Sequence, residues 1–174
     1  MILFETERLI IKRLEVVDKT YFSELFTDQN VLRLIPQQPL SELQITDIFN
    51  KNLNLELSHL NTRKCICGIY IKENPELIGL SLFLINENDD KELGYRFREA
   101  YWGKGFGTET TKGMLKYYFE NLKVKKVTAD VNIDNIASVK VLEKFMKPVH
   151  EFFNEKDDCT DRRYEVKING LQIS

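Results

Sequence analysis

The chain has 174 residues, of which 43% are hydrophobic and 30% charged, and its formal net charge is −2 with a pI near 5.8. This composition predicts a folded protein with a substantial core and gives no sign of disorder. The small net charge argues against a nucleic-acid-binding protein, and no apolar run approaches the ~20 residues that span a bilayer. We expect a single domain over residues 1–174, in a cytoplasmic protein without a membrane or nucleic-acid partner.

The first third of the chain predicts one strand followed by two helices. Aliphatic residues at 9–14 indicate the strand. Asp18 is a plausible N-cap for a short helix with an aromatic face. After a segment broken by Pro36 and Pro39, the residues Ser41-Glu-Leu-Gln44 match a capping box and open the second helix.

The middle of the chain predicts an antiparallel meander. Strand candidates at 64–72, 77–85 and 92–97 are separated by polar turns at 73–76 and 86–91. Connections this short favour antiparallel pairing over repeated βαβ units.

The last third alternates helices and strands. An apolar stripe over 108–122 predicts an amphipathic helix, and alternation over 126–131 predicts a strand with one buried face. A second helix is expected to begin near Asn135 and to be stopped by Pro148. Two closing strands are expected at 149–153 and 164–168, around a charged loop at 154–162. The predicted fold is a mixed α/β (α+β) sheet flanked by helices.

The cysteines and histidines show no pattern typical of a metal site. Cys65 and Cys67 would point to one face of a strand among aliphatic neighbours, which indicates small buried side chains. Cys159 stands alone. His59 and His150 have helix-end and strand contexts and are expected to be structural. The sequence therefore predicts no metal.

A glycine-rich turn, Tyr101-Trp-Gly-Lys-Gly-Phe-Gly-Thr108, joins the third meander strand to the helix after it. Glycines at alternate positions let backbone N–H groups approach a ligand, and the start of a helix adds unpaired N–H groups and a positive dipole end. Lys104 adds a positive charge. The turn predicts a pyrophosphate site, although a glycine corner that only tightens the chain would give the same pattern.

Other phosphate motifs fit less well. The Walker pattern is absent, and a dinucleotide fingerprint requires a glycine where Thr108 stands. Asp130 could be a ribose-binding acid, but the preceding meander lacks the βαβ units of that fold. Nucleotide binding without acyl transfer is kept as an alternative.

Asn135 and Ser138 form a second group of interest. The simple interpretation is a helix cap and a first-turn hydroxyl. If the strands at 92–97 and 126–131 are parallel, however, both following helices begin at the same sheet edge, where open α/β sheets bind ligands. We therefore expect both residues beside the glycine turn.

Three motifs in this order resemble the GNAT superfamily of acyl-CoA-dependent N-acyltransferases: Glu92-Leu-Gly-Tyr95, Trp102-Gly-Lys-Gly-Phe-Gly-Thr-Glu109 and Asn135-x-x-Ser138-x-x-Val-Leu-Glu-Lys144. The opening Thr6-Glu-Arg-Leu-x-x-Lys-Arg-Leu14 and the Trp-Gly-Lys-Gly turn resemble the ribosomal-protein N-terminal acetyltransferase (RimJ/RimL-like) branch. The resemblance covers residues 6–147. It implies a mostly antiparallel sheet with a parallel, splayed pair, and acetyl-CoA as acyl donor.

The resemblance also implies the coenzyme site. Within the family pattern Q/R-x-x-G-x-G/A, Trp102 departs from the first position, while Gly105 and Gly107 supply the glycines. The expected cofactor-binding residues are Tyr95, Arg96, Phe97, Trp102, Gly103, Lys104, Gly105, Phe106, Gly107, Thr108, Asn135 and Ser138.

For catalysis, the resemblance implies direct attack by the amine in a ternary complex. Leu142 stands where many relatives have a tyrosine acid, so Ser138 is expected to protonate the leaving thiolate. Glu92 is the candidate general base, acting through water, with a solvent-facing strand-end glutamate as the alternative. A backbone N–H near residues 95–97 could stabilise the oxyanion. Cys65 and Cys67 lack a neighbouring histidine that would favour an acyl-cysteine route.

The acceptor is a more open question. The acids Glu87, Asp89, Asp90 and Glu92 would attract a cationic amine, although a solvated hairpin loop also explains them. The resemblance favours the N-terminal α-amine of a peptide or protein. A polyamine or an aminoglycoside as acceptor, and a non-catalytic acyl-CoA-binding module, are the alternatives, with a monomer or a homodimer expected.

Overall fold

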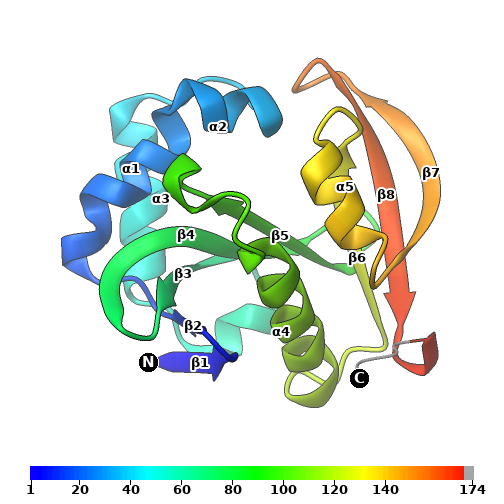
Figure 1. The fold of residues 1–174 in the computed structure, drawn as a ribbon, viewed down its shortest axis with the longest axis horizontal. Coiled ribbons are helices and arrows are strands. Elements are labelled where there is room, and N and C mark those ends of the chain that lie inside the picture. The colour runs from blue at the N-terminus through cyan, green and yellow to red at the C-terminus, as the bar shows by residue number, and fades with distance from the viewer. Residues whose placement is uncertain (171–174) are drawn as a thin grey trace.

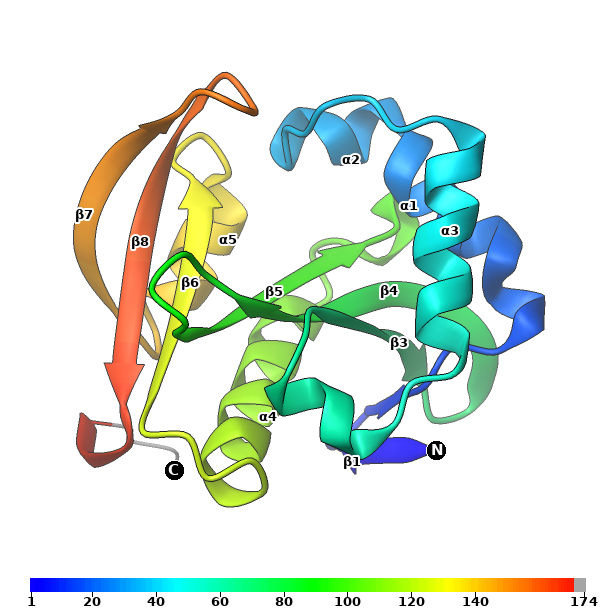
Figure 2. The same ribbon diagram turned by 180° about the vertical axis from the view of Figure 1, so that it is seen from behind.

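The computed structural model describes residues 1–170, which form a strongly twisted sheet with helices on both faces (Figures 1 and 2). The strand order is β1-β2-β3-β4-β5-β6-β8-β7. The strands are β1 (Ile2–Glu5), β2 (Leu9–Lys12), β3 (Cys65–Ile71), β4 (Asn74–Ile85), β5 (Lys91–Phe97), β6 (Lys126–Asn132), β7 (Lys147–Asn154) and β8 (Cys159–Lys167). The helices are α1 (Lys19–Thr27), α2 (Gln29–Leu34), α3 (Glu42–Leu53), α4 (Phe106–Glu120) and α5 (Ile136–Leu142).

Each face of the sheet has its own core. On one face, α4 and α5 pack on the strands, and Met114, Leu115 and Tyr118 of α4 are completely buried. On the other face, α1 and α3 pack together through Phe22 and Phe49, whose ring centroids lie 5.1 Å apart. The apolar stripes seen in the sequence are therefore the core-facing sides of these helices.

The parallel pair β5 and β6 lies at the centre of the sheet, and every other neighbouring pair is antiparallel. The two strands pair only at Lys91 with Val127 and at Glu92 with Thr128. Beyond Glu92 they separate, so the edges that face each other there have no strand partner. This confirms the expected mixed sheet with a splayed parallel pair.

Several expected boundaries near the N-terminus and the meander were wrong. The strand β1 and the helix α2 were not expected. Asp28 begins α2 because its side chain accepts hydrogen bonds from the N–H groups of Asn30 and Val31. The strand β4 begins at Asn74, inside the expected turn, since Asn74 already pairs with Ile71.

Boundaries in the last third also differ. The helix α4 begins two residues early because Gly105 caps it in the left-handed conformation. The helix α5 ends at Leu142, and Pro148 lies in β7 instead of ending the helix. Since β7 is an edge strand, a residue without an N–H is tolerated there. The β7–β8 turn is shorter than expected because β8 already begins at Cys159.

Two other expectations can be compared with the structure. Cys65 and Cys67 are completely buried, as predicted. Within residues 1–170, no helix has both the length and the apolar character needed to span a membrane.

Candidate active site

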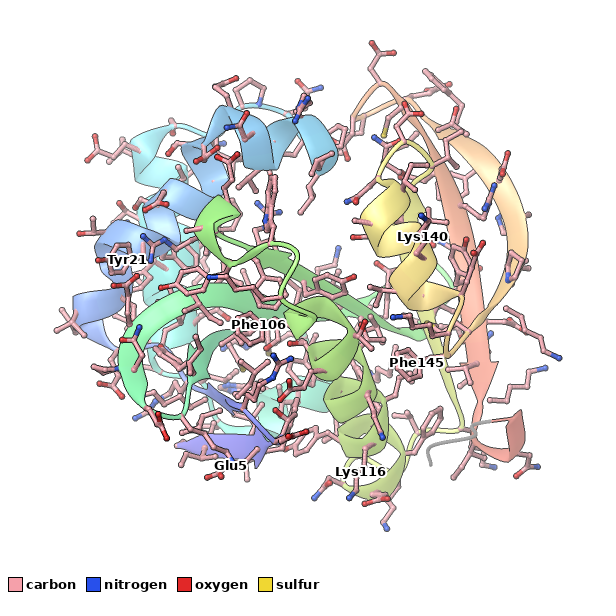
Figure 3. All side chains as sticks on the ribbon, in the orientation of Figure 1. Glu5, Tyr21, Phe106, Lys116, Lys140 and Phe145 are labelled. Atoms are coloured by element: carbon pink, nitrogen blue, oxygen red, sulfur yellow. The ribbon has the colours of Figure 1, made fainter. Side chains whose placement is uncertain are left out.

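The glycine turn lies between β5 and α4, and its backbone conformation requires glycine at two positions. Gly103 and Gly105 have φ angles of +71° and +80°, in the left-handed region that other residues rarely adopt. Gly105 precedes the first residue of α4, where the leading N–H groups of a helix lack intrahelical partners. Phe106, labelled in Figure 3, opens the helix and packs on Phe97, with ring centroids 6.3 Å apart.

The N-terminal segment holds this turn in place. Thr6 donates a hydrogen bond from Oγ1 to Glu109, in the first turn of α4, at 2.5 Å. The backbone N and Nε of Arg8 donate to the same carboxylate, each at 2.7 Å, and Nη1 of Arg8 donates to the carbonyl oxygen of Lys104 at 3.0 Å. The Thr-Glu-Arg motif near the N-terminus is thus a brace for the glycine turn, a role that the sequence alone did not indicate.

A cavity of about 280 Å³ opens beside the turn and brings together most of the expected cofactor-binding residues. Its lining includes Tyr95, Arg96, Phe97, Trp102, Gly103, Gly105, Phe106, Gly107, Thr108, Asn135 and Ser138. Lys104 does not line it. Its Nζ lies over the ring of Tyr101, 5.2 Å from the centroid, and its role toward a ligand stays a prediction.

A second, larger cavity of about 830 Å³ adjoins the first and is lined by residues of the splayed strands, the α2–α3 segment and the β7–β8 hairpin. Glu92, Asp130 and Arg163 are among its lining residues. The two cavities share Leu34, Ile35, Tyr95, Arg96, Asn135 and Ser138. A molecule in one cavity can therefore meet a molecule in the other at this junction.

Hydrogen bonds fix the side chains at the junction. The Oδ1 atom of Asn135 accepts from the N–H of Ser138 at 3.2 Å and so caps α5. The Nδ2 atom of Asn135 donates to the carbonyl oxygen of Leu34 at the end of α2, also at 3.2 Å. The hydroxyl of Tyr95 lies 3.4 Å from Oγ of Ser138. Both proposed roles of Asn135 and Ser138, as cap and as site residues, are therefore compatible with one geometry.

Glu92 lies in the second cavity, and its carboxylate accepts no hydrogen bond from any residue within 1–170. Its backbone is fixed, since the hydroxyl of Tyr118 donates to its carbonyl oxygen at 3.0 Å. Burial, with the nearby charge of Asp130, raises the pKa of Glu92 to about 7, while Arg163 opposes the rise. A carboxylate with such a pKa can take up and release a proton at neutral pH.

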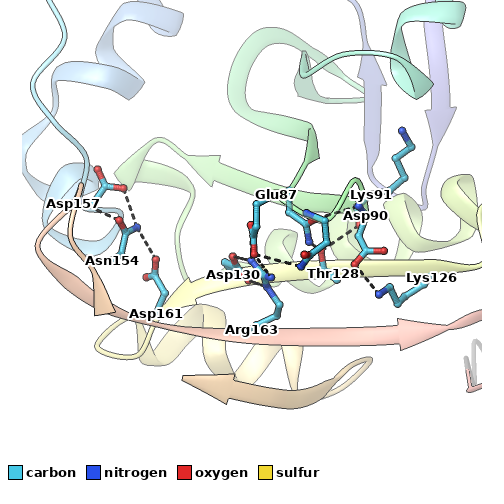
Figure 4. A network of polar contacts seen from close by, with 12 residues as sticks. Glu87, Asp90, Lys91, Lys126, Thr128, Asp130, Asn154, Asp157, Asp161 and Arg163 are labelled. Carbon is cyan, nitrogen blue, oxygen red and sulfur yellow. Dashed lines mark hydrogen bonds and ion pairs between the residues drawn. The ribbon is translucent and has the colours of Figure 1, made fainter. Parts of the chain in front are cut away.

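Glu87, Asp130 and Arg163, which line this cavity, belong to a polar network (Figure 4). Arg163 of β8 binds both oxygens of Asp130, with Nε–Oδ1 and Nη2–Oδ2 distances of 2.8 and 2.7 Å. Its Nη1 atom also donates to Glu87 at 2.5 Å, and the hydrogen bonding from Arg163 to Glu87 lowers the pKa of Glu87 to about 2. Asp90 pairs with Lys126 at 2.6 Å.

This network corrects one expectation. Glu87 and Asp90 were thought to attract a cationic amine, but both are neutralised by ion pairs. Among those acids, Glu92 is the one that faces the cavity without an ion pair in the described chain. No signal in the sequence marked Arg163, because its partners Asp130 and Glu87 lie 33 and 76 residues away along the chain.

Comparisons with known proteins agree with this geometry. Residues 8–145 match the family model described as "Acetyltransferase (GNAT) domain". The chain is 29% identical to the uncharacterized N-acetyltransferase p20 of Bacillus licheniformis, over 95% of this chain and 93% of that protein.

Two solved structures share the fold over almost their full lengths. One is RimL, the ribosomal L7/L12 alpha-N-protein acetyltransferase, in complex with coenzyme A (TM-score 0.77, 15% identity, 98% and 99% of the two chains). The other is the spermidine N-acetyltransferase of Vibrio cholerae in complex with CoA and spermine (TM-score 0.77, 19% identity, 94% and 97%). At these identities the similarity establishes the fold alone.

Proposed function

We propose that this chain, which belongs to the GNAT family of acetyltransferases, transfers the acetyl group of acetyl-CoA to the N-terminal α-amine of a peptide or protein. The observation that supports this best is the junction of two cavities at Tyr95, Asn135 and Ser138. One cavity has the glycine turn, and the other has the carboxylate of Glu92, which forms no ion pair within residues 1–170. Donor and acceptor would therefore meet in a single ternary complex within one domain covering residues 1–174.

The residues around the first cavity fit coenzyme A. Left-handed glycines at 103 and 105, next to the start of α4, provide backbone N–H groups and a positive dipole end for a pyrophosphate. The apolar side chains of Phe97, Phe106 and Val141 suit a pantetheine arm. When bound, acetyl-CoA supplies an activated thioester.

Glu92 is the proposed general base. An amine acceptor is protonated at neutral pH and must lose a proton before it can attack. A carboxylate with a pKa of about 7 is suited to accept that proton, here through a water molecule in the second cavity. The backbone N–H groups of β5 beyond Glu92, on the edge that faces β6, are proposed to stabilise the oxyanion.

Ser138 is the proposed acid. It lies at the junction, in the first turn of α5, and its position is fixed by the bond from its N–H to Asn135. Its hydroxyl would give a proton to the leaving sulfur, and the hydroxyl of Tyr95 is placed to share a proton with it.

The proposed acceptor class rests on the RimJ/RimL-like resemblance of the opening motif and the glycine turn. A polyamine is the alternative, because the fold is equally similar to that of a spermidine acetyltransferase.

An acceptor panel with thiol detection tests the proposal. The protein should release coenzyme A faster with peptides that have free N-termini than with the same peptides after their N-termini are blocked. Release should also be faster than with spermidine or an aminoglycoside. Preference for spermidine would reject the peptide acceptor. Acetyl-CoA binding without thiol release from any amine would indicate a non-catalytic module.

A further inference from the structure

Arg96 is a buried cation that has only neutral partners. Arg96 is 7% exposed, and it forms no ion pair within residues 1–170. Nη1 donates to the carbonyl oxygen of Leu25 and Nη2 to Oε1 of Gln37, both at 3.0 Å, and the guanidinium lies over the ring of Phe26, 4.4 Å from the centroid. Burial lowers the pKa of Arg96 to about 10, so the side chain is still charged at neutral pH. A charge buried without a counter-charge is costly.

The same wall of the cavity has donors without acceptors. A guanidinium has five N–H donors, and the two hydrogen bonds of Arg96 leave Nε unpartnered within the described chain. Gln37 presents its amide oxygen to Arg96, so its Nε2 points elsewhere, and this buried atom also has no partner among residues 1–170. Within residues 1–170 these two buried donors have no acceptor and the guanidinium has no counter-charge, and an anionic oxygen that reached them would supply both.

The position of this wall connects it to the acceptor. Arg96 and Gln37 both line the cavity that contains Glu92, and Arg96 also lines the junction with the first cavity. Glu92 and Arg96 are four residues apart on β5, so they share a face, with Cα atoms about 13 Å apart. One end of the cavity is thus suited to an amine and the other to an anion.

We infer that the acceptor carries an anionic oxygen, in the simplest case a carboxylate, which Arg96 and Gln37 bind while Glu92 serves the amine. The inference rests on the proposed function, because it assumes that the second cavity receives the amine. It favours an amino acid or a peptide end in which a carboxylate lies near the amine. It disfavours a polyamine, whose second ammonium would lie close to the guanidinium.

A matched series of acceptors tests this: leucine, leucinamide, leucyl-glycine and isoamylamine. The series keeps the side chain and changes the oxygen group next to the amine. We expect kcat/KM to be at least ten times higher for leucine or leucyl-glycine than for isoamylamine, with leucinamide between them. A higher kcat/KM for leucine than for leucyl-glycine would identify a free amino acid as the better acceptor. The reverse order would identify a peptide. An equal or higher kcat/KM for isoamylamine would overturn the inference.

Two variants separate recognition from a purely structural role of Arg96 as the tether of α1. Arg96→Gln removes the charge, and Gln37→Glu provides an internal carboxylate that occupies it. Each should lower the ratio of kcat/KM for leucine to kcat/KM for isoamylamine at least tenfold, whereas Arg96→Lys should retain part of the preference. An equal loss for both acceptors, which leaves this ratio unchanged, would overturn the inference.

A binding measurement does not depend on turnover. N-acetyl-leucine should bind the wild-type protein at least ten times more tightly than N-acetyl-isoamylamine in calorimetry, and Arg96→Gln should abolish the difference. Tighter binding of N-acetyl-leucine that is lost in Arg96→Gln, together with no thiol release from any acceptor, would uphold the anion site and reject the proposed function. Equal binding of the two compounds would reject the anion site even if acetyl transfer is observed.

Discussion

The hydroxyl of Tyr95 lies 3.4 Å from Oγ of Ser138, where the two cavities of the protein meet. Tyr95 comes from the splayed strand β5 and Ser138 from the first turn of α5. Burial raises the pKa of Tyr95, so its hydroxyl keeps its proton at neutral pH. The pair therefore brings two O–H groups to the place where a proton is needed by the leaving sulfur.

Replacing Ser138 with alanine should lower kcat by about 100-fold, because a positioned proton donor contributes roughly 10²–10⁴ to the rate. The dissociation constant of acetyl-CoA should change less than threefold, since the turn and most of the cavity are untouched. Steady-state kinetics and calorimetry measure the two effects. Tyr95→Phe, which keeps Ser138, should have a smaller effect on kcat. An unchanged kcat in Ser138→Ala would remove this residue from the mechanism.

Replacing Glu92 with glutamine should remove the rise of kcat/KM through about pH 7 that the wild-type enzyme is expected to show. The rise follows from the sign of the titration, since only the deprotonated carboxylate can accept a proton and this form increases as the pH passes the pKa. A pH–rate profile measures it. The same alkaline rise in the variant would show that another group is the base.

The same variant has a consequence for stability. Because the folded-state pKa of Glu92 is raised from 4.5 to about 7, stability contributed by the protonated group is lost as the pH rises between these values. Glu92→Gln should therefore stabilise the protein at pH 8 relative to the wild type, by at most about 3 kcal/mol, and have little effect at pH 4. Thermal unfolding at both pH values measures the difference. A variant that is less stable than the wild type at pH 8 would contradict the assigned environment.

Arg163 and Arg162 are neighbours on β8 and provide a matched pair for the polar network. Arg163 binds Asp130 and Glu87, whereas Arg162 binds Glu151. Arg163→Met removes a positive charge that lowers the pKa of Glu92 and leaves Asp130 unpaired, so the alkaline rise of kcat/KM should move to higher pH. Arg162→Met should leave it in place. If the pH–rate profiles of Arg163→Met and Arg162→Met coincide, the network does not act on the base.

The glycine turn can be tested with a control for backbone strain. Gly105→Val and Lys123→Val each place a branched side chain at a left-handed position, with φ of +80° and +56°. Gly105→Val should lose about 1–2 kcal/mol of stability, and Lys123→Val should lose less, because Lys123 already places a Cβ at a left-handed position. Only Gly105→Val should weaken acetyl-CoA binding, by at least tenfold, because Lys123 does not line the cavity. Equal acetyl-CoA affinity of the two variants would refute the assignment of the turn.

Local signals in the sequence predicted the parts of the fold that depend on local chemistry. The capping box at Ser41 forms as expected, with reciprocal bonds between Ser41 and Gln44 of 3.2 and 2.8 Å. The apolar stripe of α4 and the buried pair Cys65 and Cys67 were also predicted. In each case a short segment contains its own hydrophobic pattern or hydrogen-bond partner.

Relationships between distant segments could not be predicted in this way. The brace from Arg8 to Glu109 and the bond from Asn135 to Leu34 each join residues about 100 positions apart. Arg163 pairs with Glu87 and Lys126 pairs with Asp90, so two acids of a loop that looked acidic in sequence are neutralised. Arg96 was expected to bind the coenzyme because the family resemblance implies contacts at residues 95–97, and its lack of an ion pair within residues 1–170 became visible only once α1 and Gln37 were positioned around it.

The central claim is that acetyl-CoA and an amine meet in the joined cavities and react directly. Mass spectrometry of the acceptor and the protein, alongside thiol detection, tests it in one experiment. We expect one coenzyme A released for each acetylated amine, no release without an amine, and no acetylated form of the protein during turnover. Acetyl-CoA binding without thiol release from any acceptor, or an acetylated protein that forms before the product, would contradict the claim.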